Sequence, residues 1–494
     1  MLSIGLDIGT SFVKASLFDC NKGTTIALES SPDNELSIIS INNGWAEQEP
    51  DGWWAHAKAS ISKLRQKYPV QFSDVRTIGI SYQMHGLVCV GKDMEVLRPS
   101  IIWCDGRSVE IGDAAYSGLG ESYCKESLLN SPGNFTASKL AWVKENESEI
   151  FEKIYKIMLP GDFIGMKFTG EICTTYSGLS EGIFWDYLNN CLSERLMQYY
   201  GFSNSIIPRI VETFSDQGHV LKSVSNELGL PDNVTVNYRC GDQPNNALSL
   251  NVLKPGESAA TAGTSGVIYH VSDIPMTDSL SRVNTFLHVK YGEGAGLSGI
   301  LMCINSTGIA YKWVREQFGI SSYQELNKIA RESKTGANGL LFFPYGNGAE
   351  RTLNNSNPGA SILNLDLNKH NVTDIIRAVQ EGIVFSMNYG FGIMESMGLE
   401  HSIVRAGHTN MFLSNLFSQT FSNTTGLELQ LYDTTGAEGA ARGAALGAGI
   451  FTSTDDAFSS LKIKAVYESN VDERKILMDR YDQWLEHLRN KILK

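Results

Sequence analysis

The stretch IGLDIGTSFVKASLF at residues 4–18 decides the fold, and SAATAGTSGVIY at residues 258–269 repeats its centre. In each copy a Gly-Thr-Ser tripeptide lies between two short apolar runs. Glycine adopts the dihedral angles of a tight turn, and the apolar flanks are typical of strands in a buried sheet. Each copy therefore predicts a β-hairpin, and the two hairpins open the two halves of the chain.

The Gly-Thr-Ser turn is also suited to binding an anion, because it presents backbone N–H groups and two hydroxyls. A single Gly-Thr-Ser usually serves only as a turn. Its repetition at the start of each half favours a second function, namely two phosphate-binding hairpins that hold one nucleotide. In the first copy, Asp7 either supports the turn or ligates the Mg²⁺ that accompanies phosphates.

Length and composition limit the class of protein. The chain of 494 residues is too long for one hydrophobic core and predicts two large domains or three ordinary ones. The repeat favours two, and Pro255-Gly256 gives a plausible link, so we expect domains at 1–250 and 251–494. Hydrophobic residues make up 42% and charged residues 19%, which is typical of a soluble globular protein. The net charge of −13 argues against a nucleic-acid partner.

Cysteine usage and the N-terminus indicate the compartment. The eight cysteines are scattered without a Cys-x-x-Cys pair, so we do not expect a zinc site. We expect instead that the protein is located in the reducing cytoplasm. The first predicted strand begins within a few residues of Met1 and leaves no room for a signal peptide. No apolar run approaches the roughly 20 residues of a membrane span, so we expect no membrane association.

Apolar periodicity after the first hairpin predicts an α/β chain. The expected strands lie at 24–29, 76–81, 234–238 and around 283–303. The expected helices lie at 50–67, 137–153, 192–200, 221–228, 308–318, 373–397, 410–425 and 472–494. The run of small residues at 436–449 predicts a helix that packs closely on a sheet.

Three further segments carry candidate chemistry, each with an ordinary structural alternative. Asp242 follows an apolar strand, where a carboxylate is well placed to abstract a proton, or it forms a turn before Pro244. His85, within Gln-Met-His-Gly at another strand end, either contacts a ligand or packs in the core. Trp103 stacks on a sugar, or it anchors the core while Asp105 and Arg107 form a surface ion pair.

Together these residues favour one reaction class. Phosphate-binding hairpins and one strand-end carboxylate, without a nucleophile motif or a metal cluster, fit direct phosphoryl transfer from ATP to a hydroxyl. Such a site works mainly by positioning and charge neutralisation, and the Asp accepts the proton of the hydroxyl.

With these residues in view, the chain resembles the FGGY carbohydrate kinases over nearly its whole length, and among them the branch that acts on D-xylulose. The Gln-Met-His-Gly segment indicates a ketopentose, because glycerol kinases carry an Arg-Glu pair there. The segments that carry the resemblance are 7–11, 45–50, 83–86, 102–107, 159–163, 241–242, 263–266 and 343–351.

The resemblance implies two actin-like (ribonuclease H-like) ATPase domains with a cleft between them that closes over sugar and ATP. It implies ATP-dependent phosphorylation of D-xylulose at its terminal hydroxyl, with ATP and Mg²⁺ required and a homodimer left open. The implied roles are proton acceptor for Asp242; sugar contacts for Met84, His85, Gln243 and Trp103; nucleotide contacts for Thr10, Ser11, Gly263, Thr264, Gly407 and Asn410; and proximity to Mg²⁺ for Asp7.

The sequence departs from the family pattern at three places. Gln243 follows the catalytic Asp where Asn is usual, and Cys104 stands where Asn is commoner. The segment 405–410 replaces a Gly-Gly-Gly-Ala on the adenosine side. Alternative functions are a family member specific for ribulose, fuculose or gluconate, an actin-like ATPase without sugar kinase activity, and a sugar-sensing repressor. The repressor needs an N-terminal DNA-binding helix pair, which the chain lacks.

Overall fold

The first Gly-Thr-Ser stretch forms the predicted hairpin in the computed structural model. Strands β1 (Leu2–Ile8) and β2 (Val13–Asp19) are antiparallel, and Ile8 is paired with Val13 across the loop 9–12. Strand β3 (Thr24–Ser31) continues the antiparallel meander, while β5 (Val75–Tyr82) and β13 (Thr235–Gly241) run parallel to β1. The resulting sheet has the order β13-β5-β1-β2-β3. Its three parallel strands end at the same edge, which is where ligands gather in such sheets.

The structure describes residues 1–292, 296–354 and 356–492, and the chain divides into two compact units. Unit 1 comprises 1–251, 286–298 and 434–461, and unit 2 comprises 252–285, 299–433 and 462–494. The division between residues 251 and 252 lies one residue beyond the expected end of the first domain. The segments 286–298 and 434–461 come from the second half of the sequence but pack with unit 1.

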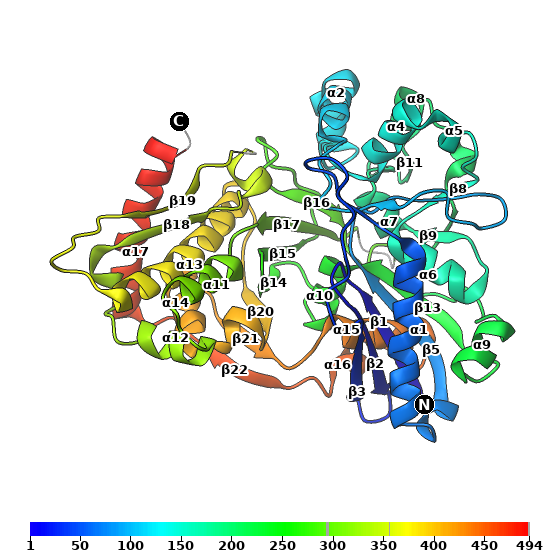
Figure 1. Cartoon of the computed structure of the whole chain (residues 1–494). Helices are drawn as coiled ribbons and strands as arrows, with labels where there is room; N and C mark the ends of the chain where they lie inside the picture. Colours follow the sequence, from blue (N-terminus) through cyan, green and yellow to red (C-terminus); the bar gives the residue numbers. More distant parts are fainter. Residues whose placement is uncertain (293–295, 355, 493–494) are drawn as a thin grey trace. The chain divides into compact units, whose positions relative to one another are not determined.

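Helices cover both faces of the sheet of unit 1 (Figure 1). The side chains of Ile4 and Leu6 pack in one cluster with Trp53 of α1 (Pro50–Lys67). Side chains alternate along a strand, so Ser3, Gly5 and Asp7 point to the opposite face. There, α15 (Gly436–Gly447) packs on β1, β5 and β13.

The contact between α15 and the sheet is made by backbone. A Cβ atom at Gly5 would lie 1.8 Å from the carbonyl oxygen of Ala437, and one at Gly79 would lie 2.0 Å from that of Ala440. Gly5 and Gly79 are neighbours on β1 and β5. The interpretation of the small-residue run as a closely packed helix is therefore confirmed.

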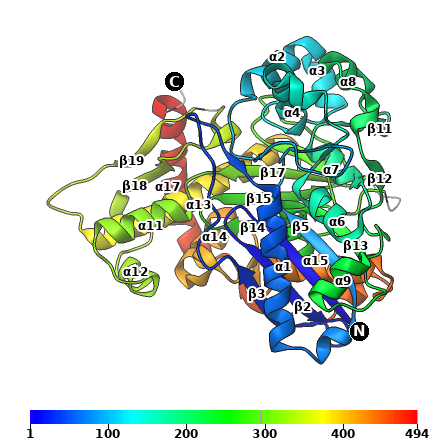
Figure 2. The same cartoon turned by 45° about the vertical axis from the view of Figure 1, so that its right-hand side comes forward.

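Helices α2, α3, α4 and α8 form a separate group within unit 1 (Figure 2). The remaining elements of unit 1 are short strands and helices. They are β4 (Glu47–Gln48), η1 (Gln71–Asp74), β6 (Val88–Val90), β7 (Ser100–Ile101), α2 (Val109–Leu119), α3 (Glu121–Glu126), α4 (Thr136–Asn146), α5 (Ser148–Phe151), β8 (Lys156–Met158), α6 (Pro160–Thr169), β9 (Cys173–Thr175), α7 (Tyr176–Glu181), β10 (Trp185–Asp186), β11 (Cys191–Leu192), α8 (Glu194–Tyr200), η2 (Asn204–Ile206), β12 (Arg209–Val211), α9 (Lys222–Leu228), α10 (Asp242–Ser249) and α16 (Thr454–Phe458).

Unit 2 repeats the arrangement of unit 1. The second Gly-Thr-Ser lies between the antiparallel strands β14 and β15, and β20 and β21 follow in parallel beside β14. The seven-stranded sheet has the order β16-β17-β15-β14-β20-β21-β22, so its middle five strands match the five of unit 1. The bounds are β14 (Glu257–Ala262), β15 (Gly266–Ser272), β16 (Asn284–Leu287), β17 (Ser298–Ile304), β20 (Ile403–Gly407), β21 (Leu429–Tyr432) and β22 (Ile463–Tyr467).

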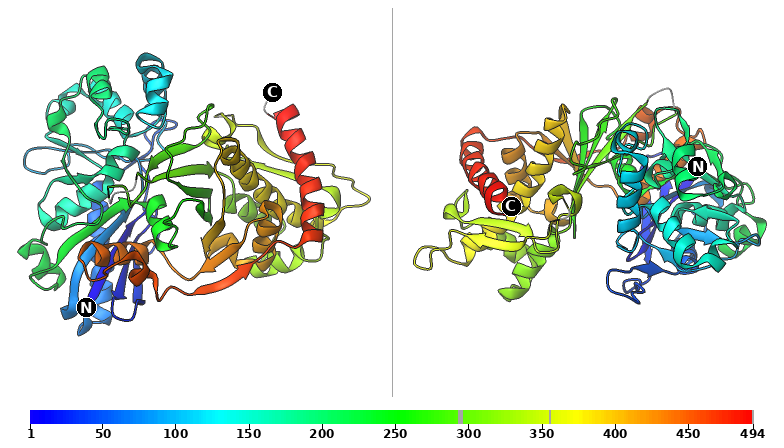
Figure 3. Two further views of the ribbon diagram at one scale, coloured as in Figure 1. Left: turned by 180° about the vertical axis from the view of Figure 1, so that it is seen from behind. Right: turned by 90° about the horizontal axis from the view of Figure 1, so that it is seen from above.

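Helices and strands of unit 2 share one hydrophobic core, and its C-terminal helix can be followed in red in Figure 3. The longest helix, α13, packs against β18, α14 and α17, and Trp484 of α17 is buried with its indole N–H donating to the carbonyl of Phe342 at 2.9 Å. The bounds are α11 (Gly308–Gln317), α12 (Tyr323–Ala330), η3 (Ala337–Gly339), β18 (Leu341–Tyr345), η4 (Glu350–Leu353), β19 (Gly359–Leu363), α13 (Val372–Ser396), η5 (Asn410–Leu413), α14 (Asn415–Thr425), α17 (Val471–His487) and η6 (Leu488–Ile492).

Two helices that were predicted as continuous are interrupted in the structure. The helix expected at 137–153 ends at Asn146, because Glu147 leaves the helical conformation (φ −132°, ψ 53°) and its carboxylate binds Arg98. The helix expected at 410–425 is divided at Ser414, whose side chain accepts the N–H of Phe417 and begins α14. The helix expected at 472–494 runs to Ile492, and residues 493–494 lie outside the described part of the chain.

Candidate active site

Asp242 lies at the carboxyl end of β13 and is the first residue of α10. It therefore follows a strand as expected, and it lies at a helix start before Pro244 rather than in a turn. Its carboxyl group has a pKa raised to about 7, first because it is buried and second because the charge of Asp7 is near. A carboxylate with a pKa near neutrality at a strand end is suited to accept a proton.

Asp7 lies near the end of β1, beside the start of α15. Its Oδ1 accepts a hydrogen bond from the hydroxyl of Ser81 at 3.1 Å, and its carboxylate lies about 3 Å from the position that a Cβ of Gly436 would occupy. Any side chain at Gly436 would therefore displace this carboxylate. Asp7 and Asp242 thus form a carboxylate pair at one edge of the sheet of unit 1.

Two of the predicted sugar contacts lie next to Asp242. Met84 is buried, and its Cγ is 2.6 Å from the position that a Cβ of Gly241 would occupy. The side-chain oxygen of Gln243 is buried and has no hydrogen-bond partner in the described part of the chain. A buried amide oxygen without a donor is costly, and a ligand hydroxyl would satisfy it.

His85 occupies the turn after β5 and adopts a left-handed conformation with φ 61°. Its Nδ1 lies 3.0 Å from the carbonyl oxygen of Glu181, and its ring packs against Phe135 and Phe286 with centroid distances of 4.8 and 5.3 Å. Strand β5 is the neighbour of β13, and Tyr82 is paired with Gly241. The turn with His85 and the end of β13 with Asp242 therefore follow adjacent strand ends.

The first Gly-Thr-Ser turn is linked to this turn by side chains. The hydroxyl of Thr10 donates to Oε1 of Gln83 at 2.9 Å and accepts the indole N–H of Trp103 at 3.0 Å. Because the carbonyl of Thr10 also accepts from Nε2 of Gln48 at 2.8 Å, its backbone N–H is the part left to face a phosphate. Ser11 is half-buried, and its carbonyl accepts the N–H of Leu36.

The structural alternative for this segment was a Trp103 that anchors the core and a surface ion pair between Asp105 and Arg107. The structure matches neither part of it. Trp103 is 40% exposed rather than a core anchor. Asp105 and Arg107 are buried rather than on the surface, and their ion pair is 2.7 Å long. This alternative was therefore wrong, and the exposed indole can stack on a ligand.

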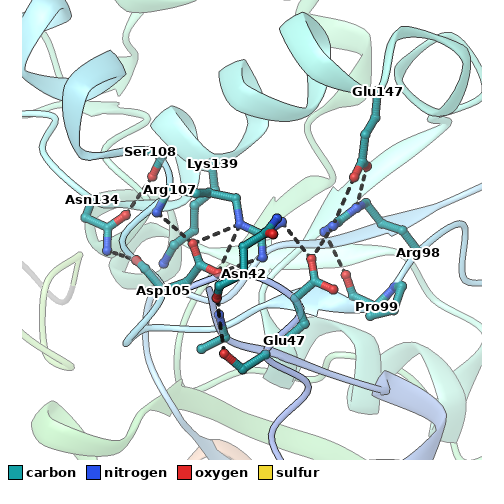
Figure 4. A network of polar contacts seen from close by, with 12 residues as sticks. Asn42, Glu47, Arg98, Pro99, Asp105, Arg107, Ser108, Asn134, Lys139 and Glu147 are labelled. Atoms are coloured by element: carbon teal, nitrogen blue, oxygen red, sulfur yellow. Dashed lines mark hydrogen bonds and ion pairs between the residues drawn. The ribbon is translucent and has the colours of Figure 1, made fainter. Parts of the chain in front are cut away.

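Asp105 and Arg107 belong to a buried network of charges (Figure 4). Glu47 forms ion pairs with Arg98 at 2.5 Å and with Arg107 at 2.7 Å, and Arg98 also binds Glu147 at 2.7 Å. The guanidinium of Arg107 stacks on Trp45 at 3.8 Å. With their polar groups engaged in this way, Asp105 and Arg107 position the loop of Trp103.

The second Gly-Thr-Ser turn lies in unit 2 between β14 and β15. The N–H of Gly308 donates to the carbonyl of Gly263 at 2.7 Å, and the N–H of Thr307 donates to that of Thr264 at 3.2 Å. A Cβ at Gly308 would lie 2.4 Å from the oxygen of Gly263, so the start of α11 holds this turn closely. The hydroxyl of Thr307 is buried and lacks a hydrogen-bond partner among the described residues.

The two other predicted nucleotide contacts lie near this turn. Gly407 ends β20, the strand beside β14, and Asn410 follows with a left-handed φ of 52°. The side-chain nitrogen of Asn410 is 3.3 Å from the position that a Cβ of Gly263 would occupy. Unit 2 therefore brings Gly263, Thr264 and Asn410 together at one edge of its sheet.

Three site residues were missed in the sequence. Lys139 and Glu181 are fully buried beside His85, and burial lowers the pKa of Lys139 to about 7 and raises that of Glu181 well above its usual range. Thr307 braces the second turn. A sequence pattern could have indicated Thr307, because Ser306-Thr307 directly precede the helix predicted from Gly308. No pattern in the sequence indicated Lys139 or Glu181.

The carboxylate of Asp7, with that of Asp242 near it, fits Mg²⁺. Magnesium in nucleotide sites is bound by one or two carboxylates together with phosphates and water, and these two carboxylates lie within electrostatic reach of each other. No cluster of three or more His, Cys, Asp or Glu residues suited to a metal is present in the ranges described. Over the same ranges, no helix is long and apolar enough to cross a membrane.

Comparison with known proteins gives one consistent result. The model for the N-terminal domain of the FGGY family of carbohydrate kinases matches residues 2–249, and the model for its C-terminal domain matches residues 258–451. The chain is 29% identical to the xylulose kinase of Escherichia coli K12, covering 90% of this chain and 88% of that one. It is also 29% identical to the xylulose kinase of Bacillus subtilis 168, covering 99% and 97%.

Solved structures agree with this result. The crystal structure of a xyloylose kinase from Brucella ovis superposes with a TM-score of 0.88, at 26% identity over 98% of both chains. The duplicated sheet order and the two matching domain models lead to one conclusion. The chain belongs to the FGGY family of carbohydrate kinases, and it is a carbohydrate kinase with the two-domain, actin-like ATPase fold of that family.

Proposed function

We propose that this carbohydrate kinase transfers the γ-phosphoryl group of ATP to the terminal hydroxyl of D-xylulose, giving D-xylulose 5-phosphate. The observation that carries the proposal is the half-buried carboxyl group of Asp242 at the end of β13, whose pKa desolvation and the nearby charge of Asp7 raise to about 7. The xylulose kinase relatives support the choice of sugar, as does the Gln-Met-His-Gly turn at 83–86.

Asp242 acts as the general base. It accepts the hydroxyl proton while the sugar oxygen bonds to the γ-phosphorus and the bond to the bridging oxygen of ADP breaks. Met84 and the ring of His85 contact the sugar, and Trp103 stacks on it. The buried oxygen of Gln243 accepts a hydrogen bond from a second sugar hydroxyl, which supplies the partner that this atom lacks among the described residues.

We assign nucleotide contacts to residues of each unit in turn. In unit 2 the turn with Gly263 and Thr264 faces the phosphates, while Gly407 and Asn410 lie on the adenosine side. In unit 1 the backbone of Thr10 and Ser11 faces the phosphates. Asp7 would hold Mg²⁺, which when bound neutralises charge on the phosphates.

Steady-state kinetics with a panel of acceptors tests the choice of sugar. Purified protein is assayed with ATP, Mg²⁺ and D-xylulose, D-ribulose, L-fuculose, gluconate or glycerol, and ADP release is coupled to NADH oxidation. We expect the highest kcat/KM with D-xylulose, by about tenfold or more over the next acceptor, because a missing or misplaced hydroxyl leaves buried polar groups unpaired.

Each other outcome identifies a different function. A higher kcat/KM for another acceptor would assign the enzyme to that sugar and overturn the choice of D-xylulose. ATP hydrolysis that no acceptor stimulates would indicate an actin-like ATPase instead. Phosphorus NMR of the product distinguishes the 5-phosphate from an ester at any other hydroxyl.

A further inference from the structure

The turn that carries His85 is held in an unfavourable backbone conformation. His85 has a φ of 61°, in the left-handed region that is strained for a residue with a side chain. Such a conformation persists only where the surrounding structure holds it.

Two buried ionisable side chains bind the backbone of His85 on either side. The ammonium group of Lys139, from α4, donates to the carbonyl oxygen of His85 at 2.8 Å. The backbone N–H of His85 donates to Oε1 of Glu181, at the end of α7, at 3.3 Å. Both side chains are at most 1% exposed.

Glu181 also sets the orientation of the imidazole. Its backbone carbonyl lies 3.0 Å from Nδ1 of His85, and a carbonyl oxygen can only accept. Nδ1 therefore carries a hydrogen and donates it to this carbonyl. Phe135 and Phe286 pack on the ring and limit its rotation.

Burial of these two ionisable groups is costly whichever protonation state they take, and packing alone does not require it. Apolar side chains of the same size would avoid the cost of removing an amine and a carboxyl group from water. Neither group is one that we placed in the transfer of the phosphoryl group. Lys139 also faces Asp105, and Glu181 also faces Asp242. The group that both side chains bind is the backbone of His85, which Lys139 reaches from 54 residues away and Glu181 from 96.

We propose that Lys139 and Glu181 are positioning residues that hold the turn of His85 in its left-handed conformation, and that the backbone carbonyl of Glu181 orients its imidazole. This inference rests on the proposed contact of His85 with the sugar. Lys139 and Glu181 themselves touch neither the sugar nor the nucleotide in this scheme.

A double-mutant cycle on the full-length enzyme tests whether Lys139 acts through His85. We compare the wild type, Lys139→Met, His85→Ala and the double variant, measuring KM for the sugar and for ATP. Lys139→Met should raise KM for the sugar about tenfold, since it removes one buried hydrogen bond, and leave KM for ATP within about twofold. In the double variant, loss of Lys139 should add less than about twofold to the effect of His85→Ala.

Lys144→Met is the matched control. Lys144 lies on the same helix and also donates to backbone carbonyls, but to those of Tyr200 and Gly201. Its loss should change both KM values by less than about twofold. A structural effect of losing any lysine from α4 would appear equally in this control and would overturn the proposal.

The remaining outcomes separate this inference from the proposed function. If His85→Ala leaves KM for the sugar unchanged, the proposed sugar contact fails. If His85→Ala raises that KM but folded Lys139→Met does not, the positioning role fails. It also fails if the effects of the two substitutions multiply in the double variant. If Lys139→Met does not fold, His85→Gly should restore folding in the double variant, because glycine adopts the left-handed conformation without strain. Failure to restore it would also overturn the proposal.

Discussion

Asp242 must be ionised to accept the proton of a sugar hydroxyl. Burial and the nearby charge of Asp7 raise the pKa of its carboxyl group to about 7. Below that pH the group is protonated, so we expect kcat/KM for the sugar to increase with pH and to level off above about pH 7. Rates measured from pH 5.5 to 8.5 test this, and a profile without a rise would contradict it.

Asp7 supplies part of that shift, and the variant Asp7→Asn isolates its part. The neutral amide no longer disfavours ionisation of Asp242, so the rise in kcat/KM should move to lower pH. The pH at which kcat/KM rises does not depend on the maximum value that kcat/KM reaches. A loss of rate through weaker Mg²⁺ binding therefore does not obscure the result, whereas an unmoved profile would argue against coupling between the two carboxylates.

Replacement of the base itself should affect catalysis far more than binding. Asp242→Asn keeps the size of the side chain but cannot accept the proton, so kcat should fall by roughly 10²–10⁴-fold. Calorimetry should find the affinity for the sugar within about threefold of the wild type. Asp232→Asn, at an exposed position of the same unit, should retain full activity. Near-normal turnover of Asp242→Asn would remove it from its proposed role.

The sequence could predict only part of this site at the scale of residues. Asp242 and His85 were recognisable because each follows an apolar strand, and strand ends meet at one edge of a sheet. Lys139 and Glu181 were not, since a lysine within an amphipathic segment and a glutamate near a short helix usually face solvent. Their burial depends on contacts with a turn far away in the sequence.

At the scale of elements, the packing of α15 on the sheet depends on glycine. A methyl group at Gly79 would lie 2.0 Å from the carbonyl oxygen of Ala440, so Gly79→Ala must push α15 away from β5. We expect a loss of about 1–3 kcal/mol in the free energy of unfolding, measured with urea. The control Gly392→Ala, on the exposed side of α13 with no atom within 4 Å, should instead stabilise by up to about 1 kcal/mol. Equal effects at both positions would contradict close packing.

Unit 2 contains a pair of histidines, one on β15 and one just before β20, that should make the protein sensitive to acid. The rings of His270, on β15, and His401 lie 4.6 Å apart with the hydroxyl of Ser258 near both Nδ1 atoms. Burial lowers the pKa of His270 to about 3, helped by His401, and that of His401 to about 4. The folded protein therefore keeps both rings neutral at pH values where the unfolded chain protonates them.

The sign of the effect follows from proton binding. Between about pH 6.5 and 4 the unfolded chain binds more protons, so the free energy of unfolding should fall as the pH falls through this range. At pH 5 each histidine accounts for a loss on the order of 2 kcal/mol. Urea unfolding of His270→Gln/His401→Gln should depend less on pH than the wild type. His219→Gln, at an exposed position, should keep the wild-type dependence, and equal slopes in all three proteins would exclude the pair.

Elements with strong local patterns were predictable, and their interruptions were not. Both Gly-Thr-Ser hairpins and helix α1 follow from apolar flanks, turn residues and Pro50 at the helix start. The break at Glu147 depends on an ion pair with Arg98, which lies on another segment. Periodicity within one stretch does not contain that information, because the partner is distant in sequence.

At the scale of the whole molecule, the chain returns to unit 1 after forming most of unit 2. The segment 434–461 belongs to unit 1, and its helix α15 accepts hydrogen bonds from the buried hydroxyls of Ser3 and Ser16 at 2.9 Å. The sequence repeat correctly indicated two similar halves, but a repeat marks where each half begins rather than where it ends. A division at residue 250 therefore separates α15 from the sheet that it covers.

This topology predicts that the first half of the chain does not fold alone. A fragment of residues 1–251 leaves the face of β1 and β5 around Gly5 and Gly79 without α15, and it leaves the hydroxyls of Ser3 and Ser16 without acceptors. We expect it to bind the dye ANS and to lack a cooperative thermal transition in circular dichroism. Fusing residues 434–461 to its end through a flexible linker should restore the transition. The same fusion with Ala441→Arg should not, because Ala441 is fully buried. Cooperative unfolding of the fragment alone would show that the sheet does not depend on α15.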